Sequence, residues 1–314
     1  MKAHGAYWIA VVVLFIAALA AALAPVNEYF FYAAFVVLQF VVLATAWNIL
    51  GGYAGYVNFG TGAFFAIGAY TATVLFKWLG APLAVQIAAA AAMSGLLGFG
   101  VGLLTLRLRG IFFAIATVAV TFVLQTVMIN WRYVGGATGL QLERPAVLEP
   151  FETYTRMLFV VVALLALIAV SVARYVQVSW IGRGLRAIRD SEEAAEACGV
   201  PTLKLKLFAC TVSGALMGAA GAPMPMYLSF IEPASSFSLN YSVSTLAMPM
   251  IGGTAHWAGP VIGALLLASI QQIATVTISS EINVLVVGVL LVLFVVLAPE
   301  GILGLFQRWL RSSR

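Results

Sequence analysis

Long apolar segments, separated by short polar connections, occupy almost the whole chain. Ten of them are predicted, at residues 7–24, 30–50, 60–79, 82–106, 110–130, 157–178, 206–228, 239–252, 258–279 and 282–298. Most contain the roughly 20 apolar residues that a helix needs to cross the hydrocarbon core of a bilayer. The pattern therefore predicts an all-α fold, a polytopic transmembrane helical bundle of about 8–10 spans, with residues 1–314 forming a single domain.

One of the ten segments, residues 239–252, is short for a crossing. It contains Pro249 and ends at the pair Gly252 and Gly253, all of which disfavour an uninterrupted helix. Backbone polar groups cannot be left open toward lipid. We therefore expect a broken or re-entrant piece whose backbone is covered by the rest of the protein.

The longest run of charged residues lies between the sixth and seventh segments, at residues 180–201. Its sequence is WIGRGLRAIRDSEEAAEACGVP, and the charges in and around it are Arg174, Arg183, Arg186, Arg189, Lys204, Lys206, Asp190, Glu192, Glu193 and Glu196. Charged side chains are costly in lipid, so we expect a structured loop that lies in water between two spans. A solvated linker whose bases only set the membrane orientation is the simplest interpretation.

The order of residues in this loop predicts short helices. Asp190 and Ser191 are favourable N-cap residues, and Asp190 with Glu193 has the spacing of a capping box. Gly199 can adopt the left-handed conformation that closes a helix, and Pro201 prevents its continuation. We expect a helix of about two turns over residues 191–198. A second helical piece precedes it, with one apolar face formed by Ile181, Leu185 and Ile188.

The same loop resembles a known sequence motif. Glu193, Ala194 and Ala195, followed after three residues by Gly199, resemble the EAA loop of ABC importer permeases. In that loop a short helix docks in a groove of the ATPase subunit. The longer string GRGLRAIRDSEEAAEACGV is similar to the LivM-type permeases of the LivHM family, which import branched-chain amino acids. The resemblance implies a cytoplasmic coupling loop at 180–201 with an EAA-type coupling helix, and as ATPase-coupling residues Arg186, Glu193, Ala194, Ala195 and Gly199.

A second stretch, residues 46–70, combines glycines with small polar residues in the sequence AWNILGGYAGYVNFGTGAFFAIGAY. Each glycine loosens a helix and each buried amide needs a partner, so a plain lipid-facing helix is disfavoured. One interpretation is a close-packed interface between helices. The other is a discontinuous helix whose backbone lines a passage, as transporters use at their substrate sites.

This stretch also resembles the LivM family, in which a segment like N-x-L-x-G-Y-x-G-x-x-x-x-G-x-x-A-F-F-x-I-G-A-Y recurs. Thr61 stands where relatives often have a histidine. A substrate different from that of these relatives is one explanation of this departure. The resemblance extends from about residue 30 to residue 308. The residues that we expect to line a substrate passage are Asn48, Gly52, Asn58, Gly60, Thr61, Phe64 and Phe65.

Composition and charge restrict the class of protein. With 63% hydrophobic and 9% charged residues, the chain is not an ordinary soluble domain. The net charge of +5 does not indicate nucleic acid, because the bases gather at the ends of apolar segments. If every segment crosses and both termini are cytoplasmic, twelve of the sixteen bases face the cytoplasm: Lys2, Arg107, Arg109, Arg174, Arg183, Arg186, Arg189, Lys204, Lys206, Arg308, Arg311 and Arg314. This asymmetry predicts a multi-pass protein of a bacterial or archaeal cytoplasmic (inner) membrane.

Several absences from the sequence argue against catalysis and ion coupling. No charged residue or histidine falls in the middle of a predicted span, where ion-coupled carriers usually need one. There is no G-x-x-x-x-G-K-[ST] phosphate loop and no G-x-S-x-G elbow. The histidines and cysteines, His4, His256, Cys198 and Cys210, lack metal-ligand spacing. We expect a non-catalytic subunit without a cofactor, driven by another subunit or passive.

The resulting hypothesis is a membrane-spanning permease subunit of an ATP-driven ABC importer, for branched-chain or other hydrophobic amino acids. The resemblance implies a LivH-type partner permease, two ABC ATPase subunits of the LivG/LivF type that bind ATP and magnesium, and a periplasmic or surface substrate-binding protein. The external loop at 131–156 and residues 229–240 are where a binding protein could touch. A urea or short-amide importer of the same family and a passive channel for a small neutral solute are the alternatives.

Overall fold

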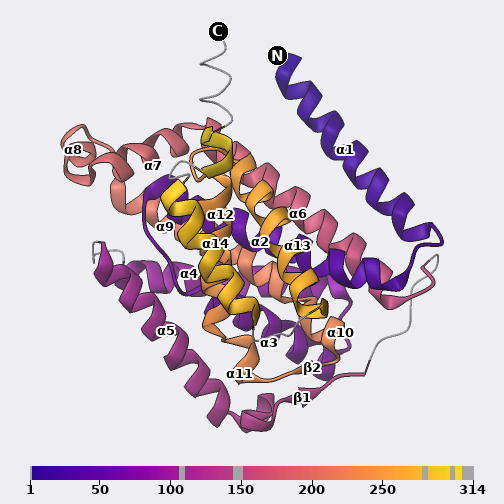
Figure 1. Cartoon of the computed structure of the whole chain (residues 1–314). Coiled ribbons are helices and arrows are strands. Elements are labelled where there is room, and N and C mark those ends of the chain that lie inside the picture. Colours follow the sequence, from indigo (N-terminus) through magenta and orange to yellow (C-terminus); the bar gives the residue numbers. More distant parts are fainter. Residues whose placement is uncertain (1, 106–109, 144–150, 278–281, 298–300, 306–314) are drawn as a thin grey trace.

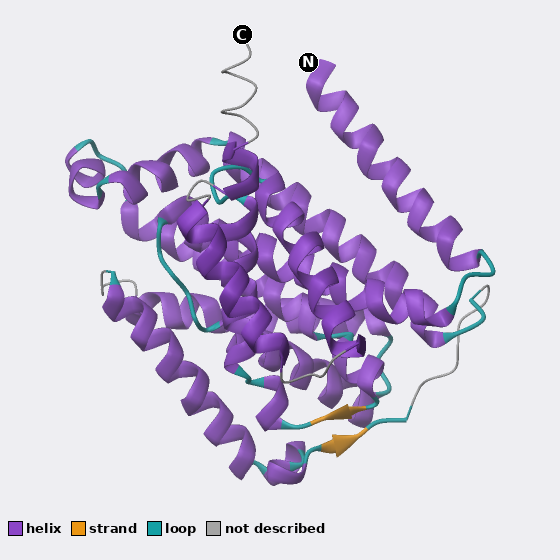
Figure 2. Ribbon diagram, in the orientation of Figure 1, coloured by secondary structure: helices purple, strands orange, loops and turns teal. Residues whose placement is uncertain are grey.

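The computed structural model of the protein describes residues 2–105, 110–143, 151–277, 282–297 and 301–305. In the described parts, helices predominate and the strands are short (Figures 1 and 2). The elements are α1 (Lys2–Leu23), α2 (Glu28–Ala54), α3 (Thr61–Leu79), α4 (Leu83–Thr105), α5 (Ile111–Asn130), η1 (Arg132–Val134), η2 (Gly136–Thr138), β1 (Leu140–Gln141), α6 (Tyr154–Val178), α7 (Trp180–Asp190), α8 (Glu192–Ala197), α9 (Thr202–Gly221), α10 (Met224–Leu228), β2 (Phe230–Ile231), α11 (Pro233–Ser236), α12 (Leu239–Gly252), α13 (Ala258–Thr277) and α14 (Ile282–Leu297).

Each of the ten predicted apolar segments contains a helix. Among the described residues, 8 helical stretches are long and apolar enough to cross a membrane. The all-α polytopic bundle is therefore confirmed. Helices α12 and α14 have 14 and 16 described residues, which is short for a perpendicular crossing.

Helices α6 and α9 begin before residues 157 and 206, where the apolar pattern predicts their starts, and α1 and α2 also begin early. A base that is paired with a carboxylate lies in the turn added to α6, Arg156, and directly after the turn added to α9, Lys206. Arg156 Nε lies 2.8 Å from Glu28 Oε1, and Lys206 Nζ lies 2.6 Å from Glu192 Oε1. Pairing offsets part of the cost of burying a charge, so the helices extend beyond the apolar residues.

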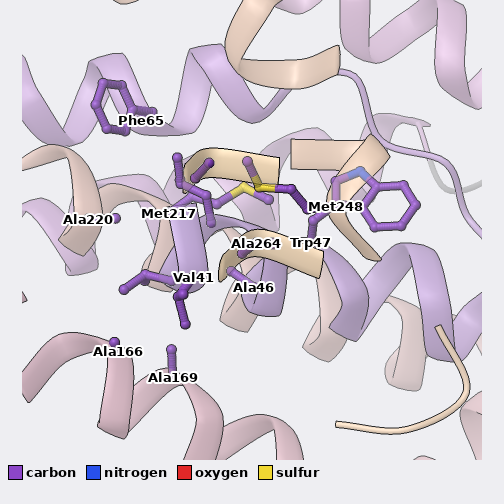
Figure 3. Close-up of a cluster of buried hydrophobic side chains, with 14 of the residues drawn as sticks. Val41, Ala46, Trp47, Phe65, Ala166, Ala169, Met217, Ala220, Met248 and Ala264 are labelled. Atoms are coloured by element: carbon purple, nitrogen blue, oxygen red, sulfur yellow. The ribbon is translucent and has the colours of Figure 1, made fainter. Parts of the chain in front are cut away.

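Helix α2 lies at the centre of the bundle and packs against α6, α9, α12 and α13. Its middle is part of a buried cluster to which all four of these helices contribute (Figure 3). The labelled members are Val41, Ala46, Trp47, Phe65, Ala166, Ala169, Met217, Ala220, Met248 and Ala264. Many are alanines, because lipid tails leave helix association to close packing rather than to water exclusion.

Helix α1 lies apart from the rest and packs mainly along α6 (Figure 1). Only 6% of its apolar window is buried inside the protein. Side chains such as Trp8, Ile9 and Val12 are therefore exposed. An exposed apolar helix of this length is suited to contact with lipid.

The bundle has two ends that can be named by their connections. The α8 end contains α7, α8, the last turn of α2 and the turn at 253–257, which are joined by hydrogen bonds from Arg189 Nη1 to Gly52 O (3.0 Å) and from Gln177 Nε2 to Ala255 O (3.2 Å). The β end contains β1 and β2, which pair antiparallel. In Figure 1, α7 and α8 lie at the upper left and the strands at the bottom.

The segment at residues 239–252 does not re-enter. Helix α12 is continuous although Pro249 lies inside it. The chain comes from β2 at the β end and reaches Thr254 at the α8 end, where Asn48 Nδ2 donates to Thr254 O (3.2 Å). The expectation of a broken or re-entrant segment is therefore wrong, although the helix is well covered by protein as expected.

Five of the bases that predict the orientation, Arg107, Arg109, Arg308, Arg311 and Arg314, lie outside the described residues. The residues at 301–305 form a helical turn, and a Cβ placed on Gly301 would lie 2.4 Å from Gly253 N. This turn therefore lies at the α8 end. The cytoplasmic location of the termini stays a prediction.

Candidate functional site

The polypeptide between α2 and α3 is a non-helical segment, residues 55–60, which we call the helix break. Gly55 closes α2 with a left-handed φ of 77° and donates its amide to Leu50 O. Helix α3 starts at Thr61 after Gly60, which makes no side-chain cap. The discontinuous helix predicted for residues 46–70 is therefore present.

Predicted passage residues hold the helix break against the end of α2. Trp47 Nε1 donates to Asn58 O (2.8 Å), and Asn58 Oδ1 accepts from Gly60 N (2.7 Å). Asn48 is fully buried, and a Cβ on Gly52 would lie 1.9 Å from its Oδ1. Glycine at position 52 is thus required by the side chain one turn earlier in α2.

The three remaining predicted passage residues form the buried start of α3. Thr61 is fully buried, and its Oγ1 has no hydrogen-bond partner among the described residues. Phe64 O accepts from Ser94 Oγ (2.8 Å), and the ring of Phe65 stacks on Tyr241 with centroids 4.5 Å apart. The predicted passage residues therefore lie along one continuous stretch of chain, and whether they line a passage stays a prediction.

Two side chains that the sequence analysis did not select also hold this region. Ser242 Oγ donates to Phe59 O (2.6 Å) and accepts from Gly62 N (3.3 Å), which joins α12 to both sides of the α3 start. Thr117 Oγ1 of α5 accepts from Phe59 N (3.1 Å). Isolated serines and threonines in apolar segments give no local signal, because their partners are far away in the sequence.

The close-packed interface, the other interpretation of residues 46–70, also holds for one glycine. A Cβ on Gly68 would lie 2.1 Å from Gly218 O of α9, and a Cβ on Gly221 would lie 2.1 Å from Phe65 O. Neither position has room for a larger residue unless α3 and α9 separate. The stretch thus combines a helix break, at 55–60, with a close contact between glycines of α3 and α9.

The charged loop at 180–201 contains two helices, α7 and α8, with a cap between them. Ser191 is the N-cap of α8, and its side chain accepts from Ala194 N. The expectation that Asp190 and Glu193 form a capping box is wrong, because Asp190 completes α7. Helix α8 is also shorter than predicted, with 6 residues rather than about two turns. Gly199 has the expected left-handed φ, 82°.

The predicted coupling residues lie partly on the exposed surface of α8. Glu193, Ala194 and Gly199 are exposed, whereas Ala195 is buried against the bundle. Arg186 points back along α7, where it donates to Gly182 O (3.3 Å) and Gln177 O (3.4 Å). It therefore stabilises the turn between α6 and α7 in this structure. These exposed residues belong to α8 and the turn that follows it, and α8 lies at the outer tip of the loop (Figure 1).

One acid of the loop, Glu192, is largely buried, although it was expected to lie in water. The side chain of Glu192 is only 14% exposed and contacts Lys206, whose side chain is 4% exposed. Both were expected among the solvated charges. Tertiary packing brings them together from either side of residues 193–205, so the sequence pattern did not reveal the pair.

The predicted external loop at 131–156 is structured where it is described; residues 144–150 lie outside that part. It contains η1, η2 and β1, and Arg156 anchors its end. Arg156 pairs with Glu28 and Glu152, both at 2.8 Å, and donates to Ala24 O and Val26 O. This arginine therefore ties the end of α1 and the start of α2 to α6.

Within the described residues, no group of three or more His, Cys, Asp or Glu side chains is placed to hold a metal ion. His256 lies in the turn at 253–257, where Nδ1 accepts from Ala258 N (3.2 Å). Burial, and secondarily the charge of Arg174, lowers the pKa of His256. A neutral imidazole is what this hydrogen bond requires.

A family model described as "Branched-chain amino acid transport system / permease component" matches residues 29–295. The permease protein LivM of a high-affinity branched-chain amino acid transport system is 26% identical in Escherichia coli K12 and 27% in Salmonella typhimurium, each over 87% of this chain and 69% of the relative.

The similarity extends to a second kind of permease over a shorter region. A probable branched-chain amino acid transport permease protein LivH from Methanocaldococcus jannaschii is 29% identical over 39% of this chain and 40% of the relative. No solved structure matches the chain.

Proposed function

Since the chain belongs to the family of branched-chain amino acid transport system permease components, we propose that it is the membrane-spanning permease subunit of an ATP-driven ABC importer. Its substrates would be branched-chain or other hydrophobic amino acids. The observation that carries this proposal is the continuous similarity to LivM over 87% of the chain. The residues matched by the family model, 29–295, include both the helix break and the loop that contains α8.

The exposed tip of the 180–201 loop supports a role in docking. Glu193 and Ala194 on α8, and Gly199 just after it, are exposed, while Ala195 and the apolar face of α7 anchor the loop to the bundle. A short, anchored helix with an exposed tip can transmit a push or pull, because it cannot bend independently of the bundle. We infer that α8 is the coupling helix and that the α8 end faces the cytoplasm.

The complete importer would contain further subunits. We propose a LivH-type partner permease, since relatives of both kinds are similar to this chain. Two ATPase subunits would bind ATP and magnesium, and a substrate-binding protein would deliver the amino acid at the β end. ATP binding would close the ATPase pair and move α8, and the spans would then shift to open the passage outward.

The route of the substrate would pass the helix break. Asn48, Gly52, Asn58, Gly60, Thr61, Phe64 and Phe65 lie at or beside it, and non-helical backbone inside a membrane protein is tolerated where it is covered by protein or lines a cavity. The Thr61 hydroxyl at the start of α3, which has no hydrogen-bond partner in the described part of the chain, supports this location. We propose these residues as the lining of the passage.

Reconstitution tests the proposal directly. The chain is co-expressed with its neighbouring permease, ATPase and binding-protein candidates, purified, and placed in vesicles that contain ATP. Uptake of labelled leucine that requires ATP and the binding protein is expected. Uptake of urea or acetamide in place of leucine would favour the other substrate class. Solute flux without ATP, by a chain that purifies alone, would contradict an importer subunit.

A further inference from the structure

A buried polar cluster joins the loop that contains α8 to the helix break. Tyr56 of the helix break donates its hydroxyl hydrogen to Glu192 Oε2 (2.5 Å). Lys206 Nζ of α9 donates to Glu192 Oε1 (2.6 Å) and to the Tyr56 hydroxyl oxygen (3.1 Å). The three side chains come from three separate parts of the sequence and meet at one point.

Charged hydrogen bonds and the packing of the Tyr56 ring hold this cluster together. Hydrogen bonds to charged groups are shorter and stronger than neutral ones, and they are stronger still away from water. The Tyr56 ring also packs edge-on against Phe113 of α5, with centroids 5.2 Å apart. Because Glu192 is the first residue of α8, a displacement of α8 would move the acceptor of the Tyr56 hydroxyl.

A second contact reaches the same region from α7. Arg189 Nη1 donates to Gly52 O (3.0 Å), a carbonyl in the last turn of α2, where a cation is favourable. The stem of Arg189 lies against Gly55, since a Cβ there would be 2.8 Å from Arg189 Cγ. Both helices of the loop therefore contact residues 52–56, which begin at the predicted passage residue Gly52 and end two residues before Asn58.

A buried ion pair contributes little net stability, because desolvation offsets much of the attraction. What such a pair does contribute is a fixed relative position of the elements that carry it. Here the elements are the coupling helix proposed above, α9, and the segment that leads into the passage. The placement suits the transmission of movement better than it suits stabilisation.

We propose that Tyr56, Glu192 and Lys206, with Arg189, form a coupling link that transmits movement of α8 to the helix break. This rests on the proposed function, since it assumes that α8 docks on an ATPase. These side chains are positioning residues: they touch neither substrate nor nucleotide. They act by keeping residues 55–60 in register with α8, and through Asn58 and Gly60 the displacement reaches the start of α3.

The test uses Tyr56→Phe in the complete importer in vesicles. This variant keeps the ring against Phe113 and the pair between Glu192 and Lys206, and it removes the hydroxyl that reaches the helix break. The matched control is Thr202→Val, which removes another bond between α8 and α9, from Thr202 Oγ1 to Glu196 Oε1 (2.6 Å). That bond does not involve residues 52–56.

Amino acid transported per ATP hydrolysed is the first measurement. We expect Tyr56→Phe to lower this ratio at least about fivefold, which is the lower end of the typical range of coupling between two sites. ATP hydrolysis and assembly should continue. Thr202→Val should leave the ratio unchanged. An unchanged ratio in Tyr56→Phe, or an equal loss in both variants, would overturn the coupling link.

Thiol labelling supplies a measurement that a purely structural role would not change. Cys198 is an exposed free cysteine at the end of α8, so an ATPase docked there should protect it from a maleimide. Val57, which is 38% exposed in the helix break, is replaced by cysteine in a second protein that lacks Cys198 and Cys210. Its labelling rate should respond to ATP, and Tyr56→Phe should abolish this response.

The two probes separate failure of the link from failure of the function. If the ATPase does not protect Cys198, the proposed docking of α8 is wrong. If Cys198 is protected but the probe at position 57 still responds to ATP in Tyr56→Phe, docking holds and the coupling link is wrong.

Discussion

Gly199→Asp provides a sharp test of α8 as the docking helix, because its cost to folding is small and can be matched elsewhere. Gly199 has a φ of 82°, and a Cβ there would meet nothing within 4 Å. The main penalty that we expect from the described residues is the left-handed conformation, about 1–2 kcal/mol for an ordinary residue and less for Asp or Asn. Domain stabilities are about 5–15 kcal/mol, so the variant should fold.

At a docked interface the same substitution has a larger effect. A carboxylate that loses water without gaining a partner costs several kcal/mol. A loss of about 3 kcal/mol corresponds to an ATPase affinity lowered about 150-fold, since each 1.4 kcal/mol is a factor of ten. Uptake should then fall to background while the permease stays in the membrane. Glu193→Lys, at the same exposed tip, should act in the same direction.

Gly80→Asp is the matched control. Gly80 closes α3 with a φ of 60°, and a Cβ there would also meet nothing within 4 Å. It therefore imposes the same backbone strain and adds the same charge on the opposite side of the bundle from α8. The assay compares ATPase co-purification and ATP-dependent uptake in vesicles for both variants. Normal uptake in Gly199→Asp, or equal losses in the two variants, would refute the docking assignment.

Three further predictions concern other parts of the chain. Arg156→Met should lower the free energy of unfolding in detergent by about 2–3 kcal/mol, because Arg156 is buried and Glu28 is partly solvated. Glu152→Gln, whose side chain is 74% exposed, should change it by less than about 1 kcal/mol. Similar changes in the free energy of unfolding of the two variants would contradict this prediction. Gly60→Leu should reduce uptake but not ATPase co-purification, since a Cβ there would lie only 3.0 Å from Asn58 Oδ1; unchanged uptake would exclude a role in the passage. The pKa of His256 is below its usual 6.5 in the folded protein, so stability from this residue is complete above pH 6.5 and decreases as the pH falls below it. His256→Gln should remove that part of the pH dependence of the melting temperature between pH 7.5 and 5.5, and an unaltered dependence would show that another group causes it.

Local sequence signals predicted much of the fold. The length of each apolar segment determined where the helices lie, because a span must satisfy its own backbone hydrogen bonds in lipid. Gly199 and Pro201 marked the end of α8, because a left-handed glycine and a residue without an amide hydrogen act within one turn. The family resemblance followed from the residue order within two stretches, 46–70 and 182–200. All of these depend on neighbours in the sequence.

The tertiary structure alone decided which groups are partners. Whether a glycine in residues 46–70 breaks a helix or permits close contact depends on what faces it: Gly55 closes α2, whereas Gly68 faces the backbone of α9. Glu192 was predicted to be solvated, but a lysine fourteen residues later in the chain buries it. A side chain's environment is determined by elements that pack against it from distant parts of the chain, and a local pattern does not record them.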